Sequence, residues 1–226
     1  TAVVTTGGTW SIPITQANVT AMGQGSERLT ATAADAAGNT AVATAGITVD
    51  TIAPDAPTIT TPIAGDNIVN GAEATAGFNV TGRGTAGDTI TLTNEAGTII
   101  GTAVVTAGGT WSIPITQANV TAMGQGLETL RATATDPAGN TSLQADTTIV
   151  VDTLAPNAPT IDPVTGDNIV NGTEAAAGFN ITGTGTAGDT ITLTNEVGTV
   201  IGTAVVTVGG TWSIPITQAN VTAMGQ

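Results

Sequence analysis

The chain has 226 residues. It has 17 acidic side chains but only three Arg and no Lys or His, so its formal net charge is −14, and it also has no Cys or Tyr. Because the missing residue types supply most general bases, covalent nucleophiles and zinc ligands, ordinary enzyme chemistry is not expected. A negative charge of this size also repels phosphates, which excludes nucleic acid as a partner.

The same composition predicts a folded chain. Apolar residues make up 40% of the sequence and charged residues only 9%, whereas disordered chains combine low hydrophobicity with dense charge. No apolar run approaches the roughly 20 residues of a membrane-spanning helix. We therefore expect no insertion into a membrane.

An internal repeat organises the sequence. Residues 1–25 return as 102–126 with a single change, and 203–226 carry the sequence a third time, again with one change at the same place. Three tryptophans mark the register at a spacing of 101 residues: Trp10, Trp111 and Trp212. Such a period predicts tandem modules, and a sequence that starts and stops in the same phase is typical of a window from a longer array.

Proline-rich joints mark the module boundaries. Residues 49–57 (VDTIAPDAP) recur as 151–159 (VDTLAPNAP), and two prolines three positions apart favour a short, semi-rigid connection. The predicted parts are the C-terminal half of one module in 1–50, a complete module in 51–152 and the N-terminal part of a further module in 153–226.

Apolar and polar residues alternate with a period of two through the complete module, which predicts half-buried β-strands. Turn sequences such as Asn70-Gly71 and Gly108-Gly109 separate these strands. About seven short strands in about 100 residues predict an all-β fold, an antiparallel β-sandwich of immunoglobulin type. The inward-facing positions are Phe78, Val80, Ile90, Leu92, Trp111, Ile113, Ile115, Leu130, Ala132 and Ala134, and a last strand is expected over 147–151.

Two local features modify this pattern. Residues 117–123 are the one stretch predicted to form a helical turn, with Val120 and Met123 facing inward. Pro114 interrupts a strand and cannot donate a backbone hydrogen bond, so its strand is expected at a sheet edge or at a bulge.

Four motifs in a fixed order resemble the bacterial Ig-like repeats of giant RTX and Bap-type biofilm adhesins: GDNIVNGAEA at 65–74, GGTWSIPI at 108–115, ATDPAGNTS at 134–142 and VDTLAPNAPTI at 151–161. The resemblance covers essentially the whole chain. It implies a secreted spacer on the bacterial cell surface that calcium makes rigid. Unlike antibody domains, the sequence has no paired Cys and no Tyr, so the tryptophan should pack against aliphatic side chains.

Acidic residues gather at the predicted joints. We expect Asp50, Asp66 and Glu73 to surround one point with the Asp35 turn close by, and their counterparts to do the same at the next joint. Carboxylate and amide oxygens suit Ca²⁺, which takes six to eight oxygen ligands. The predicted metal ligands are Asp35, Asp50, Asp66, Glu73, Asp136, Asp152, Asp167 and Glu174.

A simpler interpretation stays open for each acidic residue. Asp and Asn commonly bond their own backbone in turns, so a sequence such as DPAGN at 136–140 also fits a plain turn. For four further residues we favour that turn role: Asp88, Asp189, Glu95 and Glu196.

The sequence thus predicts a structural extender of a surface adhesin, whose partners are the neighbouring identical modules. The alternative is a filament or surface-layer subunit that associates head to tail by exchanging strands between copies. A carbohydrate-binding module is a third possibility, but it would need exposed aromatic side chains, and each module has few aromatics, all at inward positions.

Overall fold

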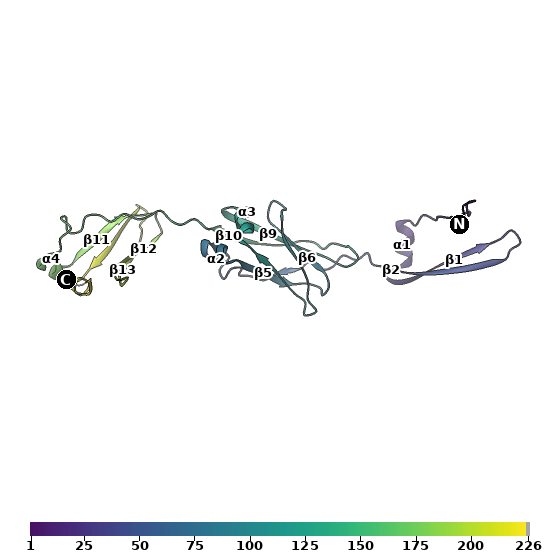
Figure 1. The fold of residues 1–226 in the computed structure, drawn as a ribbon, viewed down its shortest axis with the longest axis horizontal. Helices are drawn as coiled ribbons and strands as arrows, with labels where there is room; N and C mark the ends of the chain where they lie inside the picture. Colours follow the sequence, from purple (N-terminus) through teal and green to yellow (C-terminus); the bar gives the residue numbers. More distant parts are fainter. Residues whose placement is uncertain (225–226) are drawn as a thin grey trace. The chain divides into compact units, whose positions relative to one another are not determined.

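The computed structural model describes residues 1–224, and the chain divides into two compact units, Thr1–Thr153 and Leu154–Gln226. Each unit is described by itself. The first unit contains an N-terminal hairpin segment and the complete central module (Figure 1). The second unit contains four strands and two short helices.

The N-terminal segment is a helix followed by a long hairpin: α1 (Gln16–Met22), β1 (Gly25–Ala34) and β2 (Thr40–Val49). The two strands pair antiparallel along their whole length. Only Val49 is buried among the first 50 residues, and Trp10 keeps 54% of its surface exposed. The repeat residues that precede β1 therefore lack a core here.

The central module is a sandwich of two sheets. One sheet has the strand order β3-β5-β8 and the other β4-β10-β9-β6-β7. Neighbouring strands pair antiparallel except β4 and β10, which are parallel. The bounds are β3 (Thr58–Ile59), β4 (Ile68–Asn70), β5 (Phe78–Arg83), β6 (Thr89–Thr93), β7 (Ile99–Val104), β8 (Thr110–Ile115), β9 (Gly126–Thr135) and β10 (Ala145–Asp152).

Side chains from both sheets form one continuous core in the central module. Trp111 is 2% exposed, and its indole N–H donates to the Arg83 carbonyl at 3.2 Å, which satisfies the only polar atom of its ring. The predicted inward positions are confirmed, although Phe78 is only partly buried. The buried members from the strands are Val69, Val80, Ile90, Leu92, Trp111, Ile113, Ile115, Leu130, Ala132, Ala134, Ile149 and Val151.

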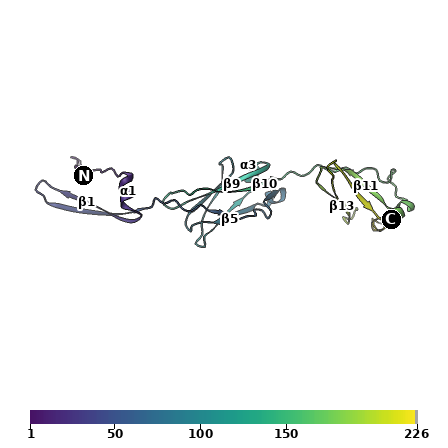
Figure 2. The same ribbon diagram turned by 180° about the vertical axis from the view of Figure 1, so that it is seen from behind.

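Two short helices lie at the end of the central module where the chain leaves it, as seen from both sides (Figures 1 and 2). The predicted helical turn is confirmed as α3 (Gln117–Met123), which buries Val120 and Met123. The second helix, α2 (Gly71–Ala76), was not predicted, because Asn70-Gly71 is a common turn signal. Here Asn70 instead caps the helix through its side chain.

The strand that contains Pro114 is β8, and it lies at the edge of the order β3-β5-β8, as predicted. Pro114 is opposite Asn79 of β5 in the register. Proline has no backbone N–H to donate. At a sheet edge the strand has a neighbour on one side only, so the missing N–H can point toward solvent.

The second unit repeats the first part of the module. Its two strand pairs are β11-β14 and β12-β13, and Trp212 is 2% exposed between them. The described part of the chain supplies no counterpart of β9 and β10 in this unit. The bounds are α4 (Gly172–Ala177), β11 (Phe179–Thr184), β12 (Thr190–Thr194), β13 (Val200–Val205), β14 (Thr211–Ile216) and α5 (Gln218–Met224).

The packing of the tryptophan against Gly82 gives a test of the central core. A methyl group at Gly82 would collide with the Thr58 carbonyl and with the Trp111 ring. We expect Gly82→Ala to lower the free energy of unfolding by about 3 kcal/mol, because overpacking forces strands apart. The matched control Gly108→Ala meets only Thr106 Oγ1 at 3.7 Å. Denaturant unfolding followed by circular dichroism should show little change for the control, and equal stability of the two variants would contradict this packing.

Candidate metal centre

The central module has two ends that carry different acidic residues. We call the end beside Asp50 the proximal end and the end beside Asp152 the distal end. Strand β10 runs from the proximal to the distal end over eight residues, a length of about 27 Å at the usual rise per residue. The turn that contains Asp136 precedes β10, so Asp136 and Asp152 lie at opposite ends. The predicted grouping of Asp136 with Asp152 is therefore wrong.

The predicted grouping of Asp50 with Asp66 and Glu73 is also wrong. Strand β4 is parallel to β10, and its register places Asn70 opposite Asp152, at the distal end. Glu73 follows directly in α2 and Asp66 lies just before β4. The length of the module therefore separates both residues from Asp50.

At the distal end these two carboxylates have local structural roles. The Asp66 carboxylate accepts a hydrogen bond from the Ile68 N–H at 2.8 Å, which closes a turn. Glu73 Oε2 accepts from the Asn70 N–H at 3.0 Å and completes the capping box of α2.

The second unit repeats both local arrangements. Asp167 accepts from the Ile169 N–H at 2.9 Å, and Glu174 accepts from the Asn171 N–H at 2.9 Å. Asp66 and Asp167 therefore have the same role in the turn, and Glu73 and Glu174 the same role in the helix cap, in both modules.

The Asp136 turn at the proximal end is held by a network of hydrogen bonds. Asp136 Oδ1 accepts from the backbone N–H groups of Ala138 and Asn140, each at 2.9 Å, and Oδ2 accepts from Asn140 Nδ2 at 2.8 Å. These bonds, led by the one from the Asn140 side chain, hold the pKa of Asp136 below its ordinary value. The carboxylate is therefore ionised throughout the physiological pH range.

The N-terminal hairpin has the same turn at its tip. Asp35 accepts from Ala37 and Asn39 in the same pattern, and the Asn39 side chain is the main cause of its lowered pKa. The turn interpretation of this motif is thus confirmed in both copies. A turn of this kind still leaves carboxylate lone pairs for a further ligand.

Asn140 links the Asp136 turn to the joint. Its Nδ2 donates to the backbone carbonyl of Asp50 at 3.2 Å and approaches Asp50 Oδ1 at 3.5 Å, across 90 positions of sequence. The structure thus brings together two of the predicted ligands, Asp50 and Asp136, in a pairing that the sequence did not predict.

A third carboxylate, that of Asp88, lies near this turn and is the least expected feature of the site. Asp88 is 3% exposed, and its Oδ2 is buried without a hydrogen-bond partner. Burial raises the pKa of Asp88, and the negative charge of Asp136 raises it further. A buried carboxylate oxygen without a hydrogen-bond partner is costly, and this cost favours the protonated form or a bound cation.

Sequence reasoning assigned Asp88 to a turn, and its backbone does form one, because the Asp88 N–H donates to the Thr85 carbonyl at 3.2 Å. The pattern AGDT gives no sign of burial. The turn becomes buried only after strands far along the chain pack beside it. No local signal could have distinguished this Asp from an ordinary turn residue.

Asp50, Asp88, Asp136 and Asn140 form what we call the proximal acidic site. Within residues 1–224, no three acidic side chains already stand close enough together to hold a metal ion. The site instead presents one buried unpaired oxygen, a neighbouring ionised carboxylate, and the Asp50 carbonyl and carboxylate beside Asn140. All of these are hard oxygen donors of the kind that Ca²⁺ prefers.

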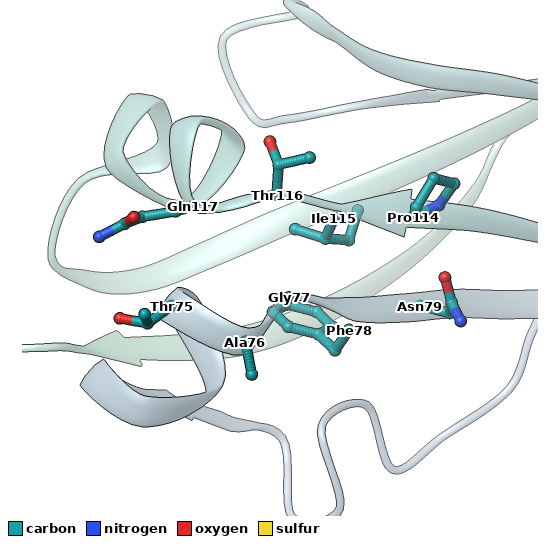
Figure 3. Close-up of a pocket in the computed structure, with 9 residues that line it drawn as sticks. All are labelled: Thr75, Ala76, Gly77, Phe78, Asn79, Pro114, Ile115, Thr116 and Gln117. Atoms are coloured by element: carbon teal, nitrogen blue, oxygen red, sulfur yellow. The ribbon is translucent and has the colours of Figure 1, made fainter.

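A shallow hollow of about 450 Å³ lies at the distal end (Figure 3). It lies between the α2–β5 junction and the β8–α3 junction, and Phe78 is its only aromatic residue. Its lining has no ionisable side chain: Thr75, Ala76, Gly77, Phe78, Asn79, Pro114, Ile115, Thr116 and Gln117. The hollow therefore offers neither acid–base chemistry nor a stacking platform of several rings.

Comparison with known families matches residues 53–152 to the family described as bacterial Ig domain. The central module is a bacterial Ig domain. The match confirms the resemblance and the all-β, Ig-like fold class predicted from the sequence. Eight strands form this Ig domain, close to the expected seven.

Several solved structures are similar to the chain. A Ca²⁺-stabilised adhesin that helps an Antarctic bacterium bind ice is 30% identical, with 88% of this chain and 50% of that chain covered and a TM-score of 0.44. A 1.5-MDa bacterial ice-binding adhesin is 28% identical, with 97% and 72% covered and a TM-score of 0.42. A bacterial immunoglobulin-like domain of the M. primoryensis ice-binding adhesin is 27% identical, with 45% and 100% covered and a TM-score of 0.33.

This chain thus spans half the length of the first of these structures. A search of curated proteins gave no match. Among residues 1–224, none of the helices is long and apolar enough to cross a membrane.

The buried charge of Asp88 predicts an unusual effect of substitution in the absence of metal. We expect Asp88→Asn to raise the free energy of unfolding by about 1–2 kcal/mol at neutral pH in chelator, because it removes an unpaired buried charge and keeps the side-chain shape. The control Asp146→Asn removes an exposed charge and should have little effect. Thermal unfolding at fixed pH measures the stability of both variants. A loss of stability in Asp88→Asn would show that the Asp88 carboxylate has a favourable partner in the folded state.

The same group gives the central Ig domain a pH dependence. The pKa of Asp88 is higher in the folded state than in the unfolded chain, so the folded state binds the proton more tightly. The stabilising contribution of Asp88 to folding is fully present below the pKa of the unfolded chain, about 3.9. It is lost as the pH rises through the higher pKa of the folded state. In chelator, the stability difference between the native protein and Asp88→Asn should therefore shrink as the pH falls. A difference that stays constant with pH would assign the effect to shape instead of charge.

Proposed function

We propose that the chain is part of the extender region of a secreted bacterial surface adhesin of the RTX or Bap type, and that Ca²⁺ at the proximal acidic site stiffens the joint between consecutive modules. The observation that carries the calcium proposal is the buried, unpartnered Oδ2 of Asp88 beside the ionised Asp136.

The ligand chemistry of the site favours a hard divalent cation. Its carboxylates have no Lys or His nearby in sequence to neutralise them, and the whole chain has only three Arg. Asp88 and Asp136 would supply carboxylate oxygens, and Asp50 would add its carboxylate or its carbonyl. These oxygens form a donor set without any soft ligand, which suits Ca²⁺ better than zinc or copper.

The positions of the ligands give the ion a mechanical role. Asp50 directly follows the last strand of one module, whereas Asp88 and Asp136 belong to the next. Without a counter-ion these like charges repel each other and oppose the contact between Asn140 and Asp50 across the joint. A bound ion attracts all three carboxylates and therefore connects the two modules.

The tandem repeat supports the extender role. Modules that follow each other at 101 residues through short proline-rich connections add length in regular increments. The cell-surface location is proposed on the same grounds, because a calcium site formed by so few ligands needs the high calcium concentration outside cells.

Calcium should stabilise the central Ig domain through Asp88 and Asp136. For the native protein we expect a rise in unfolding free energy of about 2.7 kcal/mol at a calcium concentration a hundred times the dissociation constant. Asp88→Asn and Asp136→Asn should lose most of this gain. The control Asp66→Asn changes a predicted ligand that lies at the distal end, and it should retain the gain. An equal calcium response in Asp66→Asn and Asp88→Asn would contradict the site.

The stiffening itself depends on Asp50. In the Asp50→Asn variant, Asp88 and Asp136 still bind calcium, but the ligand from the preceding module is weakened. We expect small-angle scattering of the native chain to show a longer, stiffer particle in millimolar calcium than in chelator, and Asp50→Asn to show a much smaller difference while keeping most of its thermal stabilisation. A native profile that does not change with calcium would refute the mechanical role.

A further inference from the structure

The first residue after the last strand of the central module is held by a glutamine side chain. Gln125 lies between α3 and β9, and Thr153 directly follows β10. The Thr153 N–H donates to Gln125 Oε1 at 3.0 Å, and Gln125 Nε2 donates to Thr153 Oγ1 at 2.7 Å. One side-chain amide thus binds both the backbone and the hydroxyl group of the residue at which the joint begins.

The N-terminal segment contains the same pair. The Thr51 N–H donates to Gln24 Oε1 at 3.0 Å, and Gln24 Nε2 donates to Thr51 Oγ1 at 2.7 Å. These distances equal those of the Gln125–Thr153 pair, although the segment that contains Gln24 has almost no buried core. The pair therefore follows from the strand hairpin and the backbone around the glutamine.

Two glycines shape that backbone in the central module. Gly124 has a φ of 90° and Gly126 a φ of 104°, a region that a residue with a Cβ rarely adopts. In the register of β9 and β10, Gly126 is opposite Val151 at the end of the ladder. The amide of Gln125 supplies hydrogen bonds beyond this last backbone pair, so the ordered part of the module extends to Thr153.

At the joint between the N-terminal segment and the central module, a second side chain holds the neighbouring group. Asn140 Nδ2 donates to the Asp50 carbonyl at 3.2 Å, and the adjacent Thr51 N–H donates to Gln24. The Asp50 C=O and the Thr51 N–H belong to one peptide group. Gln24 precedes the joint and Asn140 follows it, so the two sides of the joint bind the two ends of the same rigid plane.

We propose that Gln24 and Asn140 form a clamp on the Asp50–Thr51 peptide group that orients consecutive modules without any metal ion. A trans peptide group is planar, and its C=O and N–H point in opposite directions. Rotation of one module against the other therefore has to break one of the two hydrogen bonds. Because Gln125 and Thr153 repeat the pair, the next joint begins from the same fixed residue.

The chemistry of the clamp differs from that of the proximal acidic site. Both of its side chains are neutral amides, so salt does not screen these bonds as it screens interactions between exposed charges. The clamp uses the main chain of Asp50 and leaves the Asp50 carboxylate for a cation. Its experiments are made in chelator, so their outcome does not depend on whether calcium binds.

The first experiment measures amide hydrogen exchange by NMR on the full chain in chelator. We expect Gln125→Ala to speed exchange of the Thr153 N–H by about tenfold, the effect of one lost hydrogen bond, and to leave the Thr51 N–H unchanged. Gln24→Ala should do the reverse. The control Gln117→Ala replaces an exposed glutamine of α3 and should change neither rate. Unchanged rates in Gln24→Ala and Gln125→Ala would overturn the clamp.

The second experiment measures the orientation across the joint. The chain has no cysteine, so Val42→Cys and Thr148→Cys place two spin labels at exposed positions, one on β2 and one on β10. Double electron–electron resonance in chelator should give one narrow distance peak. Adding Gln24→Ala should abolish this narrow peak, whereas the control Gln16→Ala, an exposed glutamine of α1, should keep it. A distribution as broad without Gln24→Ala as with it would overturn the proposed orienting role.

Discussion

A sheet with one apolar face needs a second layer over that face, and this constraint governs every part of the chain. In the central module both layers are present, and Trp111 and Ile113 are buried to 2% and 1% exposure. In the N-terminal segment the same residue types at Trp10 and Ile12 have no facing sheet, and they are 54% and 45% exposed. Burial of apolar surface is the main stabilising contribution to folding, so the module, and not the individual strand, is the stable unit.

The proximal acidic site depends on the same constraint. Asp88 is buried because β9 and the turn after it complete the sheet beside β6. At Asp189, where those strands are missing from the unit, the equivalent carboxylate stays partly exposed. A complete core thus buries the unpartnered carboxylate, and the cation that we propose there would also contact Asp50 on the other side of the joint. In the proposed mechanism, stability of one module and stiffness between two modules have one physical origin.

Prediction from the sequence succeeded for features that have a periodic signal. Alternation with a period of two indicated the strands and the inward positions, and the GDNIVNG, TWSIPI and DPAGN motifs indicated the family. It failed for the acidic residues, because Asp in a turn gives one signal whether it caps a helix, closes a turn or lies buried next to another carboxylate. Glu73 was assigned to a metal and caps α2, whereas Asp88 lies in the predicted turn but is also buried, with an unpartnered carboxylate oxygen.

The three copies of TWSIPITQANVTAM show which elements the local sequence determines and which depend on tertiary contacts. The helix forms in all three copies, at α1, α3 and α5, because its hydrogen bonds join residues four apart and its capping groups lie within the same segment. The strand forms at β8 and β14, where β5 and β11 provide a partner, but not in residues 10–15, where no partner strand is present. The sequence by itself therefore determined the short helices, the turns and the alternation of the strands. Only the tertiary structure decided which strands form and which carboxylates meet, since strand pairing and the burial of Asp88 depend on residues far apart in the chain.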